Sequence, residues 1–264
     1  MAKPADYNEI KARVTWLGAA AGLDLQSFPV PEIGLELLRV RIPSAGAASR
    51  RLFLAAGVHG DEPAAVTAVL QFLEERRREQ YPGIDFTIYP CVNPDGFDAG
   101  TRENATGDDI NRSFHGEGTP ESRALRRSLE GNRFDYWIDA HEDYAEDGYY
   151  MFAPTDSEWA ADVVAAVGKV GPVTAKPEID EMKIVAGIVD HEKDVPDMME
   201  ERQDWPLAFY MIKNFSKRGF TPETPGLLDL DLRVRMQLAA YDAALSMLSQ
   251  EAAGVATPSG SAAD

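Results

Sequence analysis

Cysteine is nearly absent from this chain, since Cys91 is the only one in 264 residues. A single cysteine excludes an intrachain disulfide and gives no support for secretion into an oxidising compartment. No run approaches the roughly 18 apolar residues of a membrane-spanning helix, and residues 1–9 lack the basic and apolar regions of a signal peptide. We therefore expect a soluble, cytoplasmic protein with no membrane partner.

Positive charge is also scarce, because 26 lysines and arginines face 44 aspartates and glutamates, for a formal net charge of −18. The overall field repels nucleic acid, so we exclude a nucleic-acid partner. The acidity favours a well-solvated surface, and selection of cationic substrates is the alternative. The sequence does not indicate an oligomeric state.

Apolar runs alternate with helical patterns along most of the chain. Strands are predicted over residues 36–42, 52–58, 86–92, 136–140 and 149–153, and helices over 64–78, 120–129, 159–167, 206–217 and 231–248, with a short segment of unassigned type around 220–224. This order predicts one α/β domain over residues 1–250, with a mixed, largely parallel twisted sheet flanked by helices. A long loop is predicted over 93–118, no element is assigned within 171–202, and 251–264 is predicted to be a flexible tail.

Two of the four histidines lie at the ends of predicted strands. His59 and Glu62 follow the continuously apolar strand 52–58, and His141 ends strand 136–140. In open α/β sheets the carboxyl ends of the strands form the ligand-binding edge, so we expect these side chains to converge. Histidine and carboxylate ligands with an open position are typical of catalytic zinc, whereas core or hydrogen-bonding histidines are the alternative.

A zinc-ligating histidine needs a hydrogen-bond acceptor for its second ring N–H. Asp61, Asp139 and Asp143 stand next to the candidate ligands in the sequence. We therefore take these carboxylates as candidates for orienting the imidazoles.

The predicted loop displays Arg102 and Arg112 near the same edge of the sheet. These arginines could bind a substrate carboxylate bidentately, or stabilise the oxyanion formed when water attacks a carbonyl. The alternative is a solvated loop in which they pair with Glu103, Asp108 and Asp109.

Glu223 stands in the sequence Thr-Pro-Glu-Thr-Pro, between two prolines. Each proline favours an extended conformation in the residue before it, which stiffens the backbone that carries the carboxylate. A fixed and partly desolvated carboxylate suits a general base that activates water. A surface glutamate in a turn is the alternative.

Taken together, these motifs resemble the zinc metallocarboxypeptidase superfamily, the carboxypeptidase A-like fold, over about residues 50–230. The resemblance lies in HxxE at 59–62, Asn-Pro-Asp-Gly at 93–96, Arg-x-Asn at 102–104, Asp-x-Asn-Arg at 109–112, His141 and Glu223. The short chain is most similar to small bacterial members such as murein peptide amidases. The Glu-Thr-Pro ending at 223–225 is similar to the succinylglutamate desuccinylase and aspartoacylase branch.

The resemblance implies a zinc-dependent metallopeptidase of the carboxypeptidase type, which would hydrolyse an amide bond adjacent to a free carboxylate in a small peptide. It implies one zinc ion per chain held by His59, Glu62 and His141, Arg102 as oxyanion stabiliser, Asn111 and Arg112 as the clamp on the substrate carboxylate, and Glu223 as general acid/base. An N-acyl amino acid deacylase is the alternative, and a non-catalytic binding protein of the same fold is a third reading. The family's substrate-capping tyrosine has no single match, because Tyr149, Tyr150 and Tyr210 all qualify.

Overall fold

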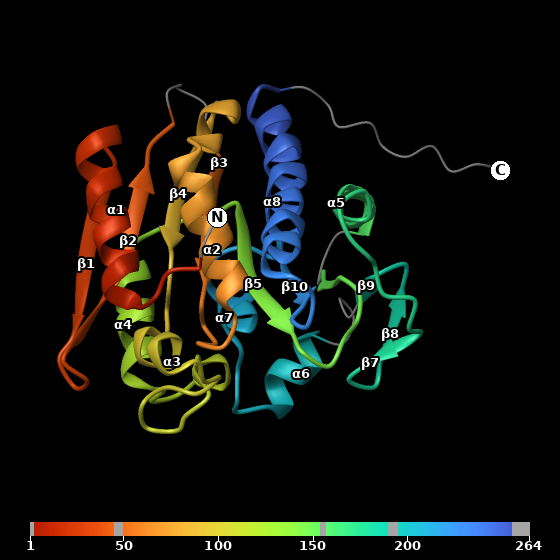
Figure 1. Ribbon diagram of the computed structural model, residues 1–264. Helices are drawn as coiled ribbons and strands as arrows, with labels where there is room; N and C mark the ends of the chain where they lie inside the picture. Colours follow the sequence, from red (N-terminus) through yellow and green to blue (C-terminus); the bar gives the residue numbers. More distant parts are fainter. Residues whose placement is uncertain (1–2, 45–49, 154–156, 190–194, 255–264) are drawn as a thin grey trace.

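A ten-stranded sheet forms the centre of the computed structural model, which describes residues 3–44, 50–153, 157–189 and 195–254 (Figure 1). In spatial order the strands are β1 (Asp24–Val30), β2 (Leu35–Ile42), β4 (Ile84–Tyr89), β3 (Arg50–Ala56), β5 (Tyr136–Asp143), β10 (Gly219–Pro225), β6 (Tyr150–Phe152), β9 (Ile188–Val189), β8 (Met182–Val185) and β7 (Glu178–Ile179). The helices are α1 (Tyr7–Ala21), α2 (Pro63–Glu74), α3 (Pro94–Ala99), α4 (Pro120–Leu129), α5 (Ser157–Val167), α6 (Val195–Glu201), α7 (Leu207–Asn214) and α8 (Leu230–Ala252), with 3-10 turns at Arg77–Gln80 and Ile110–Arg112. The predicted α/β class and mixed sheet are confirmed.

The middle of the sheet is parallel. Strands β4, β3, β5 and β10 pair parallel with one another, whereas β2 joins β4 and β6 joins β10 in antiparallel pairs. Parallel neighbours need crossover connections, and α2 supplies the one between β3 and β4. As a result, the carboxyl ends of β3, β5 and β10 meet at one edge of the sheet.

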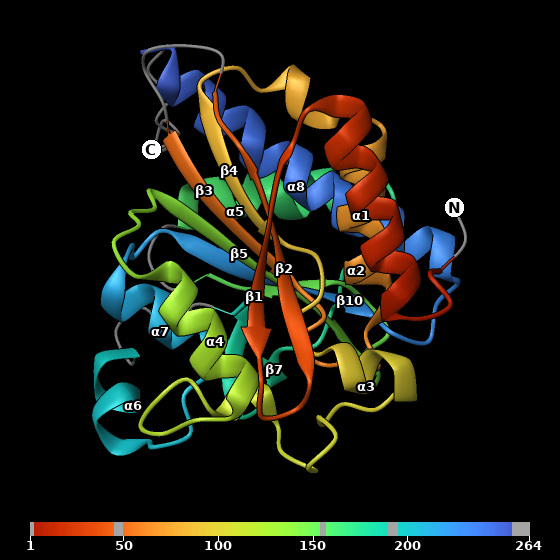
Figure 2. The ribbon, with the colours of Figure 1, turned by 90° about the vertical axis from the view of Figure 1, so that its left-hand side faces the viewer.

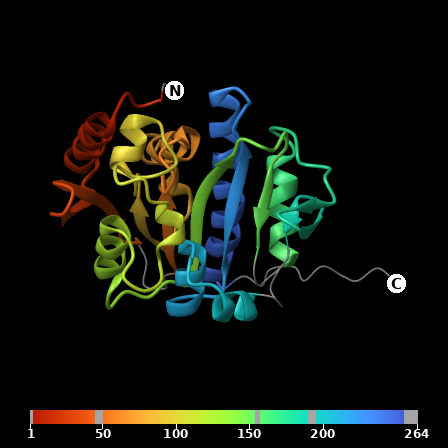
Figure 3. The ribbon, with the colours of Figure 1, turned by 90° about the horizontal axis from the view of Figure 1, so that it is seen from below.

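Helices cover both faces of the sheet (Figure 2). Side chains alternate along β3, so that Leu52 and Leu54 pack into the core cluster under α2 and α8, whereas Phe53 packs into the cluster on the α4 and α7 side. Seen from below, the early segments α1 and β1 lie at one end of the sheet and β7 to β9 lie at the other (Figure 3). In the described part of the chain, no helix has the length and apolar character needed to span a bilayer.

Several predicted elements occur with shifted bounds, and the structure also contains elements that were not predicted. Strand 36–42 was expected at the outside of the sheet, but the unpredicted β1 pairs with it and takes the edge. The loop over 93–118 contains α3, and the unassigned stretch 171–202 contains β7 to β9 and α6. Residues 251–252 of the predicted tail lie in α8, while 255–264 lie outside the described residues.

Candidate metal centre

The strand register brings the predicted ligands to one place. Ala56 of β3 pairs with Ala140 of β5, so His59 and His141 both follow closely on this pair. Glu62 occupies the N-cap position of α2, directly after the turn that leaves β3. The three side chains therefore come from two adjacent strand ends and one helix start.

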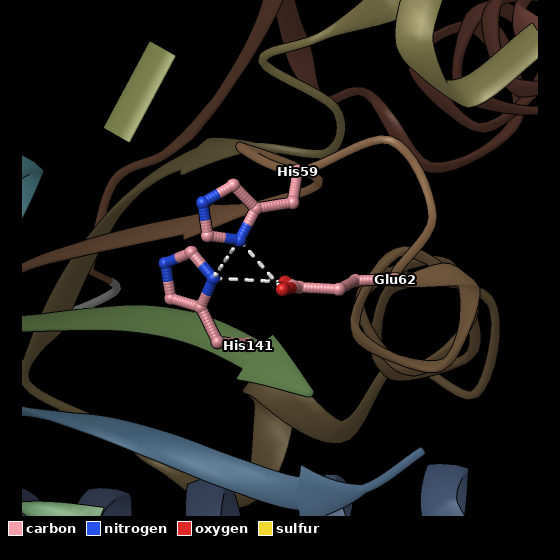
Figure 4. A group of neighbouring side chains, drawn as sticks. All are labelled: His59, Glu62 and His141. Atoms are coloured by element: carbon pink, nitrogen blue, oxygen red, sulfur yellow. Dashed lines mark hydrogen bonds and ion pairs between the residues drawn. The ribbon is translucent and has the colours of Figure 1, made fainter. Parts of the chain in front are cut away.

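The ligand atoms of His59, Glu62 and His141 all lie within 4.8 Å of one another, and all three residues are buried (Figure 4). Glu62 bridges the two rings, because its Oε1 lies 2.6 Å from His59 Nδ1 and its Oε2 lies 2.8 Å from His141 Nδ1. The two Nδ1 atoms are themselves 3.1 Å apart. Burial alone would raise the pKa of Glu62, but the two histidines outweigh it and lower this pKa to about 2.

This donor set fits zinc. Two imidazole nitrogens and one carboxylate are usual ligands of catalytic zinc, and donors at about 2.0–2.1 Å in tetrahedral directions stand roughly 3.3 Å apart. The observed spacings of 2.6 to 3.1 Å are close to that value. The same three residues were predicted from the sequence, and the structure brings them together.

Carboxylates face the second nitrogen of each ring. His141 Nε2 lies 3.2 Å from Oδ2 of the buried Asp139, which is two residues earlier on the same face of β5. His59 Nε2 lies 3.4 Å from Asp109 Oδ1. Both contacts are ion-pair distances without hydrogen-bond geometry, and they put a carboxylate near the nitrogen that would carry the ring N–H if Nδ1 binds a metal.

Of the aspartates proposed from the sequence, Asp139 thus faces a ligand histidine, whereas the Asp143 carboxylate accepts a hydrogen bond from the Tyr150 hydroxyl at 2.8 Å. Among the described residues, Asp61 Oδ1 is buried without a hydrogen-bond partner, and the backbone carbonyl of Asp61 accepts from Tyr144 at 2.6 Å. Asp109 was not proposed for this role. The sequence feature that could have indicated this role is the place of Asp109 in the Asp-x-Asn-Arg motif, two residues before Asn111.

Two glycines allow the His59 loop to lie directly against α3. A Cβ on Gly60 would lie 1.9 Å from the carbonyl carbon of Gly96, so the two backbones are in direct contact. Gly96 sits in the first turn of α3, where Asn93 caps its N–H at 2.9 Å and also donates to the Arg102 carbonyl at 3.1 Å. The Asn-Pro-Asp-Gly motif therefore connects the ligand loop to the arginine loop.

Arg102 lies beside the ligands. Its Nη1 is 3.3 Å from His59 Nδ1, and its Nε and Nη2 donate to Asp109 Oδ2 at 3.0 and 2.9 Å. One carboxylate thus contacts both the predicted oxyanion stabiliser and a predicted ligand. Burial would raise the pKa of Asp109, but His59 and Arg102 hold it well below its usual range.

Asn111 and Arg112 differ in what they leave available for a substrate. The Asn111 side chain accepts from the Leu207 N–H at 2.8 Å and places its Nδ2 3.3 Å from His141 Nε2. The Arg112 side chain is 43% exposed, and its Nε is 4.0 Å from Asp204. Arg112 Nη1 donates to the Asn111 carbonyl at 2.8 Å, and the rest of the guanidinium faces the cavity, whereas the Asn111 side chain contacts Leu207 and His141.

Glu223 lies next to the ligand group. It pairs in register with His141 on the neighbouring parallel strand and with Tyr150 on the other side. Burial raises the pKa of Glu223 well above its ordinary value, and Glu62 and Asp143 add to this while His141 opposes it. A carboxylate with raised pKa has the basicity that proton transfer requires.

These residues line one cavity of about 540 Å³. Its wall includes His59, Glu62, Arg102, Asn111, Arg112 and Glu223, together with apolar side chains such as Phe152, Met182, Met198 and Phe209. Among the tyrosines considered from the sequence, Tyr150 lines the cavity; Tyr144, which was not considered, lines it too and is 41% exposed.

A family model and a curated relative each match part of this chain. Residues 48–173 match the family model of the succinylglutamate desuccinylase/aspartoacylase catalytic domain. Murein peptide amidase A of Escherichia coli is 33% identical over 88 residues, which is 32% of this chain and 34% of that protein. The chain thus matches only about a third of the length of this curated relative.

Solved structures share the fold over nearly the whole chain. A candidate metallopeptidase from Shewanella baltica is 22% identical, covers 93% of both chains and has a TM-score of 0.78. Carboxypeptidase A from Helicoverpa armigera is 17% identical, covers 96% of this chain and 74% of its own, and has a TM-score of 0.69. The resemblance predicted from the sequence is confirmed.

Proposed function

This chain has the fold of the zinc carboxypeptidase-like superfamily, and from that premise we propose that it is a zinc-dependent hydrolase of amide bonds adjacent to a free carboxylate. The observation that carries the proposal is the convergence of His59, Glu62 and His141 within 4.8 Å. Glu223 pairs in register with His141 and lines the same cavity as His59 and Glu62. Burying two imidazoles and two carboxylates side by side is costly unless they are paired or bind a metal, so this cluster favours a functional role.

His59, Glu62 and His141 would hold one zinc ion. When bound there, zinc supplies a Lewis acid that polarises a carbonyl and makes water more acidic. Asp109 and Asp139 would keep the two rings in the tautomer that leaves Nδ1 free.

Glu223 is proposed as the general base and acid. It pairs in register with His141 and lines the cavity, so its carboxylate could take a proton from the attacking water and return that proton to the departing amine. Arg102, held by Asp109, would donate to the oxyanion that develops on the carbonyl oxygen.

Arg112 would fix the substrate carboxylate. Its guanidinium is exposed in the cavity wall and can pair bidentately with a carboxylate. Asn111 would contribute chiefly by contact with the His141 ring. Together they would orient the scissile bond, which lowers the entropy cost of the reaction.

The substitution Glu223→Gln tests the assignment of the base. Glutamine has nearly the same shape but cannot accept the proton, so we expect zinc content to stay at the wild-type level while kcat falls about 100- to 10,000-fold. Zinc is measured on the purified variant by plasma mass spectrometry and kcat with the best substrate of the wild-type protein. Wild-type turnover in this variant would remove Glu223 from the mechanism.

A second function, the release of an amino acid from a small N-acyl group, is favoured by the family match over 48–173. Short peptides and N-acyl amino acids, offered separately to the zinc-loaded protein, distinguish the two. A peptidase should release amino acids from the peptides alone, whereas a deacylase should act on the N-acyl amino acids alone. No hydrolysis of either set by zinc-loaded protein would favour the non-catalytic reading.

A further inference from the structure

Glu62 stands at the N-cap of α2 but does not cap it. Its side chain contacts His59 and His141 and makes no hydrogen bond to the first turn of the helix. The first backbone N–H groups of a helix nevertheless need acceptors, particularly where the helix start is buried.

Glu142 of β5 supplies that acceptor from another part of the chain. Its Oε1 accepts from the backbone N–H of Ala64, in the first turn of α2, at 2.6 Å. A carboxylate at this position also suits the positive end of the helix dipole. Because side chains alternate along a strand, Glu142 reaches α2 while the adjacent His141 faces Glu62.

Helix α8 contacts Glu142 and the end of β5 through two of its side chains. Arg233 pairs with Glu142 Oε2, and both residues are buried. One turn further along, Gln237 donates to the His141 carbonyl at 2.7 Å and contacts Thr224 Oγ1 at 3.3 Å. Arg233 and Gln237 therefore bind the two strand ends that carry His141 and Glu223.

We propose that Glu142, Arg233 and Gln237 are positioning residues that set the separation of Glu62 from His141 and thereby the affinity for metal. Glu62 moves with the start of α2, and His141 moves with the end of β5. Glu142 connects these two elements directly, because it lies on β5 and accepts a hydrogen bond from α2. Helix α8 fixes the Glu142 side chain through Arg233. The inference rests on the proposed zinc site, and it concerns residues outside the proposed set of metal ligands, of which Glu142 also lines the cavity.

The test compares the zinc dissociation constants of folded variants, measured by competition with a chromogenic chelator in the absence of substrate. For Arg233→Met we expect zinc binding about 10- to 100-fold weaker than in the wild type, as for other residues that orient metal ligands. Arg233→Lys keeps a cation beside Glu142 and should recover part of the affinity. Gln237→Met, which removes the bond to the His141 carbonyl, should also weaken binding.

Arg218→Met is the matched control. Arg218 pairs with Glu251 at 2.6 and 2.9 Å, so it joins the start of β10 to the far end of α8, about 27 Å along the helix from Arg233. Loss of this pair removes a contact of α8 without touching the ligand-bearing strand ends. Its zinc affinity should equal that of the wild type.

The outcomes separate the two proposals. Wild-type protein that binds no zinc would overturn the proposed function itself. Zinc binding in wild type that is unchanged in folded Arg233→Met and Gln237→Met would overturn the positioning role and leave the zinc site standing. If Arg233→Met does not fold, Arg233→Lys and Gln237→Met decide the question in the same assay.

Discussion

At the scale of single residues, Asp109 connects three parts of the candidate centre. Its Oδ1 accepts from the Asn111 N–H at 2.8 Å and lies 3.4 Å from His59 Nε2, while its Oδ2 accepts from Arg102. One carboxylate thus orients a predicted ligand and the predicted oxyanion donor. Its loss should disturb both metal binding and turnover.

We predict that Asp109→Asn lowers both zinc affinity and kcat/KM by about 10- to 100-fold, because the amide cannot serve as a charged acceptor for both His59 and Arg102. Asp108→Asn is the control, since the neighbouring Asp108 accepts only local hydrogen bonds, such as that from Thr106 at 2.7 Å. Both variants are compared with wild type by chelator competition and steady-state kinetics. Equal effects of the two substitutions would argue against the orienting role of Asp109.

The ligands could be predicted from the sequence, whereas Asp109 could not be assigned its partner. His59 and His141 each follow an apolar strand, and the carboxyl ends of parallel strands meet at one edge, so local patterns sufficed. The contact of Asp109 with His59 depends on the path of a loop that begins more than thirty residues after the histidine, and no periodic pattern encodes that path.

At the scale of elements, the direct contact between the His59 loop and α3 determines which residues both segments can contain. A Cβ on Gly60 would lie 1.9 Å from backbone atoms of Gly96, and backbone cannot move aside as a flexible side chain can. The ligand loop and α3 must therefore move apart if either glycine gains a side chain.

We predict that Gly60→Ala destabilises the fold by about 1–3 kcal/mol or more through overpacking, with weaker zinc binding as a consequence. Gly18→Ala is the control, because Gly18 lies within α1 and a Cβ there would meet its nearest neighbour at 3.6 Å. Alanine should be neutral or slightly stabilising in that helix. Urea unfolding of the two variants checks this, and equal stability would show that the loop tolerates separation from α3.

Elements with their own periodicity were predicted well, and elements that depend on neighbours were not. Helix α4 was predicted with its bounds, because Thr119 caps it, Pro120 begins it and its apolar stripe is clear. Strands β7 and β9 have only two residues each and exist through their pairing with β8 and β6. Helix α3 has six residues, and its signals, Asn93 at the N-cap and Gly100 at the C-cap, are equally typical of a loop.

At the scale of the whole molecule, the parallel centre of the sheet is what assembles the candidate centre. Strands β3, β5 and β10 are adjacent and share one direction, so residues from positions 59, 141 and 223 meet at one edge. Helices α2 and α8 then join these strand ends through Glu142 and Arg233. The class of fold and the place of the site follow from the order of the elements. The substrate depends on cavity walls that include β6, β8 and α6, and of these β8 and α6 lie in the stretch 171–202, where no element was predicted.

The zinc content of the purified protein tests the central claim most directly. After incubation with zinc and removal of excess metal, we expect about one zinc ion per chain in the wild type and in Glu223→Gln, and far less in His59→Ala and His141→Ala, because two of the three protein donors do not suffice to hold zinc tightly. Plasma mass spectrometry on folded protein gives the ratio. Wild-type protein that retains no zinc, or alanine variants that retain as much as the wild type, would contradict the account.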